Sequence, residues 1–180
     1  MGLKEPRRLE GDELWNYVLK ILGGRAHSIG ELREKLRRRV AKVEDIEPLL
    51  DRLKEYGYLD DRRYAESYAA ARLSNDKLGS ARVVRDLRQR RVAPALAEKS
   101  VSEAYRGVKE EELIEAWVRR KYRLAPKENL FQEDKDMASA YRRLLRAGFR
   151  TGDIVRVLKR FAKNPELLED LPVSEEGEES

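Results

Sequence analysis

The chain has 180 residues, of which 41% are charged and none is cysteine, and its net charge is +5. The absence of cysteine excludes disulfides, thiolate catalysis and cysteine-ligated zinc, and it fits a reducing compartment, so we expect a cytoplasmic location. No apolar run approaches the roughly 20 residues that span a bilayer, and the charged N-terminus lacks the apolar segment of a signal peptide, so we expect no membrane association.

Apolar residues recur every three to four positions along most of the chain, which predicts helices and no strands. The first helix is predicted over about 12–23. A second begins at Ser28, which has the capping-box spacing to Glu31. A third is predicted from about Asp45, with Pro48 tolerated in its first turn.

A tight corner is predicted to follow the third helix. Gly57 is suited to end that helix, because glycine adopts the left-handed conformation without steric cost. Asp60 or Asp61 can cap the next helix, which is predicted to run to about Ser74. Two tyrosines then share one face of it at a spacing of four residues. We interpret the corner as a structural junction made by Gly57, Asp60, Asp61, Tyr64 and Tyr68.

The same pattern continues to the end of the chain. Gly79-Ser80 opens a fifth helix, and Pro94 lies in the first turn of a sixth. A seventh is predicted from about Lys109, and an eighth follows a predicted linker at 124–132. The last helix is predicted to begin with Thr151 as its N-cap.

The middle helices of successive trios carry similar segments, which indicates an internal repeat. Leu36, Leu87 and Leu145 head these segments at separations of 51 and 58 residues. The predicted fold class is therefore all-α, as an elongated, curved array of three tandem three-helix repeats. The predicted organisation is a flexible N-terminus at 1–11, repeats at 12–57, 58–107 and 108–162, and an acidic, disordered tail at 163–180.

Charge is distributed unevenly. Residues 163–180 hold one base and seven acids, whereas residues 1–162 hold 38 bases against 27 acids, a net of +11. A basic body suits a polyanionic partner such as nucleic acid, although a highly charged solvated surface is the plain alternative. The tail either remains disordered or screens the basic body until a partner arrives.

The bases concentrate on the middle helices. Residues 33–42 hold six bases and one acid, 82–91 hold five and one, and 142–150 hold four and none. Such segments can follow a phosphate backbone or an acidic protein groove, or they can simply be solvated. The predicted partner-binding residues are Arg33, Arg37, Arg38, Arg39, Arg82, Arg85, Arg88, Arg90, Arg91, Arg142, Arg143 and Arg146.

Signals for an enzyme are weak. His27 is the only histidine and is interpreted as a loop residue, and helix capping accounts for Asp60-Asp61. Glu110-Glu111-Glu112 heads a helix, where negative charge complements the dipole. No glycine-rich loop of the Walker type occurs. We therefore expect a non-enzyme without cofactor or metal, in which most tyrosines pack in the core.

Specific motifs resemble those of the bacterial RecX family, the regulators of RecA recombinase. The segment from Gly57-Tyr58-Leu59-Asp60-Asp61 to Tyr64-Ala65 and Tyr68, followed by Arg72, resembles the most recognisable part of that family. Ser28-Ile29-Gly30-Glu31-Leu32 is similar to its first-unit motif, and Gly79-Ser80-Ala81-Arg82 with Leu87-Arg88-Gln89-Arg90-Arg91-Val92 to its second. One departure is Arg39-Val40-Ala41, where the family usually has glycine before an aromatic residue or isoleucine.

The resemblance implies a protein that binds the RecA–DNA filament in its helical groove and inhibits ATP hydrolysis and strand exchange. We expect the protein to be a monomer. The family brings no catalytic residues. Single- and double-stranded DNA are then partners, contacted directly or through RecA. Two alternatives remain open: a direct DNA-binding helical-repeat protein, and a protein-interaction scaffold without RecA involvement.

Overall fold

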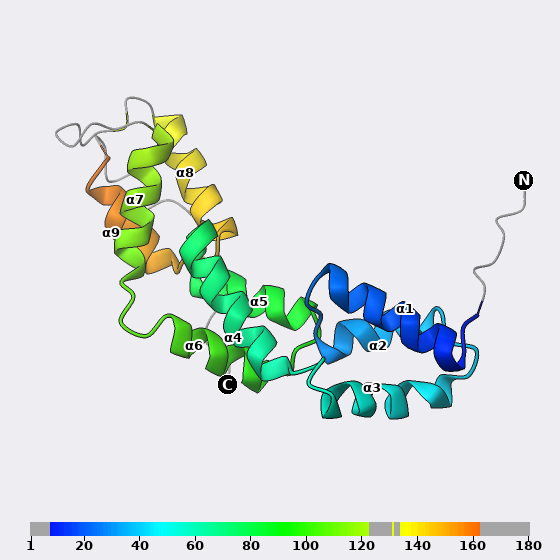
Figure 1. Cartoon of the computed structure of the whole chain (residues 1–180). Coiled ribbons are helices and arrows are strands. Elements are labelled where there is room, and N and C mark those ends of the chain that lie inside the picture. The colour runs from blue at the N-terminus through cyan, green and yellow to red at the C-terminus, as the bar shows by residue number, and fades with distance from the viewer. Residues whose placement is uncertain (1–7, 123–130, 132–133, 163–180) are drawn as a thin grey trace, which may run out of the picture. The chain divides into compact units, whose positions relative to one another are not determined.

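The computed structural model describes residues 8–122, 131 and 134–162, and these residues form an all-α protein (Figure 1). They contain no β-strand beyond one isolated bridge, between Leu9 and Val40. Nine α-helices lie in this part of the chain, which confirms the prediction of an all-α protein: α1 (Gly11–Gly24), α2 (Ile29–Arg37), α3 (Ile46–Glu55), α4 (Asp61–Ala71), α5 (Ser80–Gln89), α6 (Pro94–Ala104), α7 (Glu110–Tyr122), α8 (Asp134–Arg146) and α9 (Thr151–Lys159). None of these helices is long and apolar enough to cross a membrane.

The chain divides into two compact units, and the boundary between them passes through the middle helix trio, α4–α6. The first unit holds the described residues up to Ala69, together with Asp86–Val101. The second unit holds Ala70–Arg85 and the described residues from Ser102 onward. The end of α5 and most of α6 therefore pack with the first trio, and the start of α5 packs with the last.

The first unit has its core inside the trio α1–α3. Leu14 and Val18 of α1 meet Leu32 and Leu36 of α2, all at most 3% exposed, and Leu50 of α3 is fully buried beside them. The i, i+4 spacing of these residues places each pair on one helix face, as the periodicity predicts.

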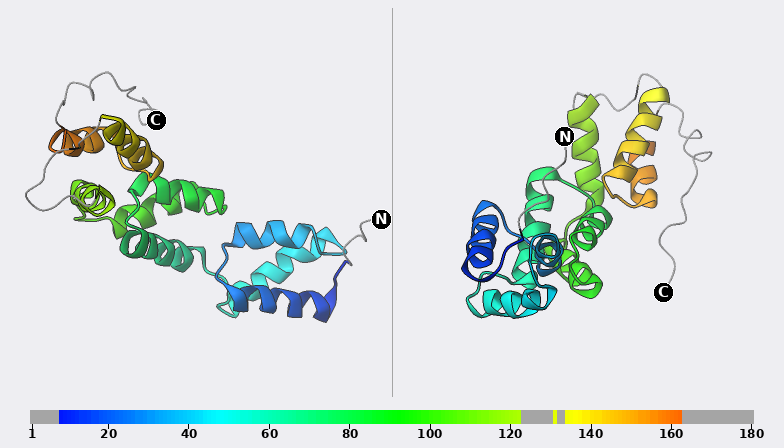
Figure 2. Two further views of the ribbon diagram at one scale, coloured as in Figure 1. Left: turned by 90° about the horizontal axis from the view of Figure 1, so that it is seen from above. Right: turned by 90° about the vertical axis from the view of Figure 1, so that its right-hand side faces the viewer.

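The second unit is built around α7, α8 and α9, which stay adjacent in both views of Figure 2. Ile114 of α7, Leu144 of α8 and Ile154 of α9 are fully buried in one cluster. Phe131 joins this core, and its amide donates a hydrogen bond to the carbonyl oxygen of Phe161 at 2.7 Å.

Helix starts follow the sequence signals with one exception. The Ser28 hydroxyl accepts a hydrogen bond from the Glu31 amide at 3.0 Å, and Asp60 accepts one from the Arg63 amide at 2.9 Å. The prediction that Thr151 is the N-cap of the last helix is wrong. Arg150 holds the N-cap position without a side-chain cap bond, and Thr151 is the first helical residue.

Two short helical turns were not evident from periodicity. A 3₁₀ turn at Val43–Asp45 leads into α3, and a π turn at Arg72–Asp76 extends α4 before Lys77, whose φ is 53°. The predicted fourth helix, to about Ser74, ran into the π turn, whereas the 3₁₀ turn precedes the predicted start of the third helix near Asp45. The predicted linker at 124–132, apart from Phe131, and the predicted tail at 163–180 lie outside the described residues, as do residues 1–7 of the predicted flexible N-terminus.

Candidate partner-binding surface on the basic helices

The arginines of α2 divide into internal and exposed ones. Arg33 donates hydrogen bonds from Nε and Nη2 to the two carboxylate oxygens of Glu47 on α3, at 2.7 and 3.0 Å. Donating hydrogen bonds to the Glu47 carboxylate raises the pKa of Arg33 above its ordinary value. This bidentate pair links two helices of one trio, so Arg33 is already engaged within the fold.

Arg37 and Arg38 are exposed at the end of α2 and share one carboxylate. Each guanidinium lies 3.8 Å from an oxygen of Glu34, and Arg91 approaches the same carboxylate at 3.5 Å. Three positive charges thus surround a single negative charge. Exposed pairs at such distances contribute little stability, so these side chains can exchange Glu34 for an external anion at small cost.

Arg39 lies differently from its neighbours. Its guanidinium carbon is 5.6 Å from the centre of the Tyr17 ring on α1, a cation–π contact. Its carbonyl oxygen accepts a hydrogen bond from the Leu9 amide at 2.8 Å. The hydrogen bond between Leu9 and Arg39 could not be predicted from the sequence, because Leu9 is a single apolar residue before the first helix and shows no periodicity.

The α5 arginines also differ in their surroundings. Arg82 donates from Nη1 to the carbonyl oxygen of Arg146 at 3.1 Å, and Arg88 pairs with Glu98 on α6. Arg85 is exposed, and none of the described residues pairs with it. Of these three, Arg85 retains the most freedom to contact a partner.

The α8 arginines are exposed and basic without internal compensation. Arg142 and Arg143 have no carboxylate partner among residues 8–122, 131 and 134–162. Arg146 donates from Nε to the Arg142 carbonyl oxygen at 3.3 Å, and its own carbonyl accepts from Arg82. The end of α8 therefore presents positive charge that the described fold does not neutralise.

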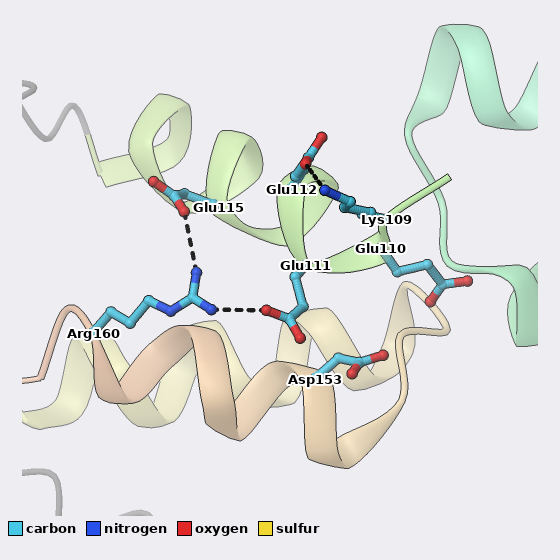
Figure 3. Close-up of a pocket in the computed structure, with 7 residues that line it drawn as sticks. All are labelled: Lys109, Glu110, Glu111, Glu112, Glu115, Asp153 and Arg160. Atoms are coloured by element: carbon cyan, nitrogen blue, oxygen red, sulfur yellow. Dashed lines mark hydrogen bonds and ion pairs between the residues drawn. The ribbon is translucent and has the colours of Figure 1, made fainter. Parts of the chain in front are cut away.

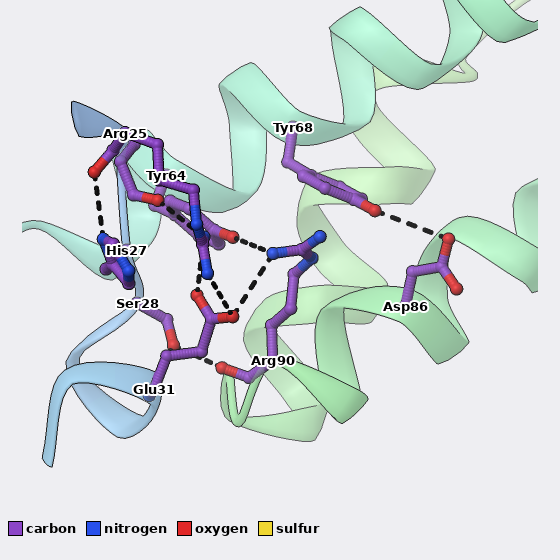
Figure 4. A network of polar contacts seen from close by, with 9 residues as sticks. Arg25, His27, Ser28, Glu31, Tyr64, Tyr68, Asp86 and Arg90 are labelled. Carbon is purple, nitrogen blue, oxygen red and sulfur yellow. Dashed lines mark hydrogen bonds and ion pairs between the residues drawn. The ribbon is translucent and has the colours of Figure 1, made fainter. Parts of the chain in front are cut away.

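Arg90 belongs to a polar network within the first unit (Figure 4). Its side chain is 29% exposed, and Nη1 lies 3.3 Å from both Glu31 Oε1 and the Tyr64 hydroxyl. The Tyr68 ring centre is 4.9 Å from its guanidinium carbon. The structure thus places Arg90 together with the predicted junction residues Tyr64 and Tyr68, whose rings stack at 6.1 Å.

Glu31 is the carboxylate at the centre of this network. Besides Arg90, it pairs with Arg25 at 3.2 Å (Figure 4). Burial acts to raise the pKa of Glu31, but the Arg25 hydrogen bond and the charges of Arg25 and Arg90 together hold it below its ordinary value. The capping-box spacing located Glu31 correctly, yet its carboxylate serves two arginines.

His27 is buried beside the network and is 5% exposed. Its Nδ1 lies 2.9 Å from the Arg25 carbonyl oxygen, which can only accept, so Nδ1 carries the proton. Nε2 is buried without a hydrogen-bond partner among the described residues. Burial is the main reason that the pKa of His27 lies below its ordinary value of 6.5. The interpretation of His27 as a loop residue holds, but the loop is packed.

Equivalent bonds recur at the starts of the first two middle helices, one in each unit. The Ile29 amide at the start of α2 donates to Asp61 Oδ1 at 2.7 Å. The Ser80 amide at the start of α5 donates to Glu110 Oε1 at 2.9 Å. In both cases an acid at the start of the following trio satisfies an open helix amide, so these acids join successive trios.

Glycines permit close backbone approach at the same two places. A Cβ atom on Gly30 would lie 2.4 Å from the Arg91 Cβ, and one on Gly79 would lie 2.3 Å from the Gly148 carbonyl oxygen. Arg91 and Gly148 both have positive φ, 60° and 87°, at the ends of α5 and α8. The turn that ends one middle helix therefore packs on the start of the preceding one.

Gly57 ends α3 as predicted, with a φ of 71°. Its amide donates to the Lys54 carbonyl oxygen at 2.9 Å, and the Tyr58 amide donates to that of Leu53 at 2.9 Å. These two bonds form a Schellman motif, in which the left-handed residue is most often glycine. Asp60 and Asp61 divide the predicted capping role: Asp60 caps α4, and Asp61 joins α4 to α2.

One pocket of about 440 Å³ lies in the second unit, between α7 and α9 (Figure 3). Arg160 reaches from α9 to Glu111 at 2.8 Å and to Glu115 at 3.6 Å. Lys109 pairs with Glu112 at 3.5 Å. The acids head α7 as predicted and are largely used in pairing. No group of three or more potential metal ligands occurs in the described part of the chain.

The basic helices α2, α5 and α8 carry groups that are suited to binding an anionic partner. Exposed guanidinium groups without strong internal partners can hold phosphate or carboxylate groups of a partner. Of the twelve predicted binding residues, Arg33, Arg88 and Arg90 are paired within the fold. Among those that remain exposed with weak pairing or none are Arg37, Arg38, Arg85, Arg142 and Arg143.

Comparisons with known proteins agree with this organisation. Models of the first and second three-helix domains of RecX match residues 15–53 and 60–101. The chain is 31% identical over 141 residues to the regulatory protein RecX of Trichlorobacter lovleyi, covering 78% of this chain and 90% of that protein. It is 40% identical over 104 residues to that of Pseudomonas syringae pv. tomato, covering 57% and 65%.

The fold is also that of a solved relative. The crystal structure of RecX from Lactobacillus salivarius matches with a TM-score of 0.64 over 82% of this chain and 94% of that chain, at 18% sequence identity. Together with the aligned relatives, this confirms the resemblance that the corner at Gly57 and the repeated basic segments carry. The chain belongs to the RecX family of regulatory proteins.

Proposed function

We propose that the protein binds the RecA–DNA filament in its helical groove and inhibits RecA ATP hydrolysis and strand exchange, thereby modulating recombination and DNA repair. Membership in a family of regulatory proteins supports this proposal. The observation that carries it is a group of five exposed arginines on the middle helices that the described fold leaves weakly paired or unpaired, chosen from the larger exposed set: Arg37, Arg38, Arg85, Arg142 and Arg143.

These arginines suit a partner that combines protein and phosphate groups. A guanidinium binds carboxylate and phosphate alike, through two parallel hydrogen bonds. Arginines that already have a bidentate internal partner, such as Arg33, gain less from an external one. We therefore assign the contacts to the five exposed arginines and give the paired ones a structural role.

The proposed inhibition requires no catalytic residue of this chain. A protein that contacts several neighbouring subunits of a filament disfavours any rearrangement that changes the spacing between them. ATP turnover in such a filament then slows, because the bound state is stabilised relative to the rearranged one. In this proposal the chain is a non-enzyme that acts by binding.

The test is a variant in which all five exposed arginines are replaced by alanine. We expect it to need at least about tenfold more protein for half-maximal inhibition of RecA ATPase on single-stranded DNA, with a flatter salt dependence. The matched control replaces the same five residues by lysine, which keeps the charge and should restore part of the inhibition. Equal inhibition by the alanine variant and the parent would contradict the assignment.

The same exposed arginines suit a direct DNA-binding protein, and one further measurement separates the two functions. Fluorescent single- and double-stranded DNA is titrated at two salt concentrations, with and without RecA. The filament proposal predicts tighter binding when RecA coats the DNA. A direct DNA binder predicts that RecA competes with the protein, and a scaffold without RecA involvement predicts no effect on RecA at all.

A further inference from the structure

An exposed aromatic corner lies in the first unit, where α3 ends at Gly57. Tyr56 and Tyr58 flank this glycine and are 60% and 52% exposed. Apart from Val43, they are the only exposed large hydrophobic side chains in the described residues. Trp15 of α1 and Arg52 of α3 complete the group. We call Trp15, Arg52, Tyr56 and Tyr58 the aromatic corner.

The three rings touch one another by their edges. Their centres are 5.9 Å apart for Trp15 and Tyr56, 6.5 Å for Trp15 and Tyr58, and 6.4 Å for Tyr56 and Tyr58, with interplanar angles between 61° and 73°. Edge-to-face packing does not cover both faces of an exposed ring. The tyrosines can therefore still accept a flat group on a ring face.

Positive charge accompanies the rings. The Arg52 guanidinium carbon lies 4.2 Å from the Trp15 ring centre and 5.5 Å from that of Tyr56. Arg63 donates from Nη2 to the Gly57 carbonyl oxygen at 3.0 Å. Both arginines are exposed, and neither has a carboxylate side-chain partner among the described residues. Their charges remain free to attract an anion beside the rings.

The fold itself does not require aromatic residues here. The second trio also ends at a left-handed glycine, Gly107, whose φ is 76° against 71° for Gly57, although its turn lacks the Schellman bonds of Gly57 among the described residues. Arg106 and Val108 flank that glycine, and the turn closes with the Val108 amide bonded to the Tyr105 carbonyl oxygen at 3.0 Å. A left-handed glycine can thus end a trio without a flanking pair of exposed aromatic residues.

We propose that the aromatic corner is a stacking site for unpaired bases of single-stranded nucleic acid, with Arg52 and Arg63 attracting the adjacent phosphates. Every base has a flat π face, so stacking on tyrosine tolerates any sequence. A protein partner fits less well. Two tyrosine rings supply little of the roughly 800 Å² that a stable protein interface buries on each side, whereas one stacked base needs only one ring face.

This site includes none of the arginines assigned to filament binding, so it does not depend on the proposed function. Its ligand is nucleic acid whose bases are unpaired. Duplex DNA hides its base faces in the helical stack and offers this site only phosphates. An oligonucleotide without bases also offers only phosphates. The difference in affinity between a single strand with bases and one without bases therefore measures the contribution of stacking.

The test measures binding of a fluorescent 15-nucleotide oligo-dT and of an abasic oligonucleotide of equal length at low salt. The parent should bind oligo-dT more tightly. Tyr56→Leu/Tyr58→Leu, which keeps apolar side chains and removes the rings, should weaken oligo-dT binding at least about tenfold. The affinity for the abasic strand should fall little in this variant. Tyr56→Phe/Tyr58→Phe keeps the rings and should bind oligo-dT like the parent.

Two controls guard the interpretation. Val43→Ala removes the remaining large exposed hydrophobic side chain of the described residues and should leave binding unchanged. In a Trp117→Phe background, Trp15 is the only tryptophan, and its fluorescence should change when oligo-dT binds. The proposal is overturned if the parent does not prefer oligo-dT over the abasic strand. It is equally overturned if the leucine variant binds oligo-dT like the parent. This holds even if that variant has lost RecA inhibition.

Discussion

Arg85 and Arg90 are the same residue type five positions apart, and their surroundings give them different roles. Arg85 is exposed and has no partner among the described residues, whereas Arg90 meets Glu31 and Tyr64 at 3.3 Å. A planar guanidinium with several fixed hydrogen bonds stabilises the fold, and an exposed one is available to a partner. Sequence periodicity placed both on a basic segment but could not separate them, because the partners of Arg90 lie 26 and 59 residues away in sequence.

The protonation of His27 tests directly whether the loop that carries it is packed. It is the only histidine, so a single imidazole resonance reports its protonation. We expect NMR titration to give a pKa below 6.5, because burial disfavours the charged ring and Nε2 has no acceptor among the described residues. A titration midpoint at or above 6.5 would mean that the ring is not buried as described.

The same depressed pKa sets the sign of a stability change with pH. The unfolded chain binds the proton more readily than the folded one, so the stability due to a neutral His27 is present above pH 6.5 and is lost as pH falls through the folded pKa. Urea unfolding of the parent should therefore show lower stability at pH 5.5 than at pH 7.5. His27→Gln, which cannot titrate, should show a smaller difference between the two pH values.

At the level of helices and turns, local sequence signals predicted the secondary structure but not the contacts between helices. Helix order, the Ser28 cap and the left-handed Gly57 follow from spacing and residue type, and the structure confirms them. The Thr151 cap was wrong because the helix starts one residue earlier than the threonine signal suggested. For the candidate site, the helices that carry the arginines could be predicted. Which arginines pair internally depends on facing helices, as for Arg33 and Glu47, and sequence spacing does not report it.

The close approach of successive middle helices gives a prediction at this scale. Gly30→Ala places a Cβ atom 2.4 Å from the Arg91 Cβ and 2.7 Å from its carbonyl oxygen, so backbone must move. Overpacking of this kind costs about 1–3 kcal/mol of unfolding free energy. Gly79→Ala should behave alike in the second unit, where the clash is with Gly148 at 2.3 Å.

Two glycines within helices serve as controls for these substitutions, because they have no close neighbours. Gly23 in α1 and Gly152 in α9 have nothing within 4 Å of an added Cβ atom. Alanine at either position should be neutral or should stabilise the helix by about 0.5–1 kcal/mol. Chemical denaturation followed by circular dichroism compares all four variants. Equal stability of Gly30→Ala and Gly23→Ala would show that the middle helices do not pack as closely as described.

At the scale of the whole molecule, net charge is the feature on which the proposed function depends. Residues 1–162 carry a net charge of +11, and several arginines on the middle helices of both units are not neutralised by the described fold. A binding protein of this kind acts through the number of contacts it makes at once, since each exposed charge contributes little by itself. Sequence composition predicted this property well, because net charge is additive and needs no knowledge of the fold.

We propose that this protein regulates RecA by binding its filament. The most direct measurement is the rate of ATP hydrolysis by RecA on single-stranded DNA at rising amounts of the protein, starting well below one molecule per RecA subunit. We expect strong inhibition at substoichiometric amounts, because one bound protein restrains several neighbouring subunits. An unchanged rate of hydrolysis at amounts equal to or above that of RecA would contradict the claim.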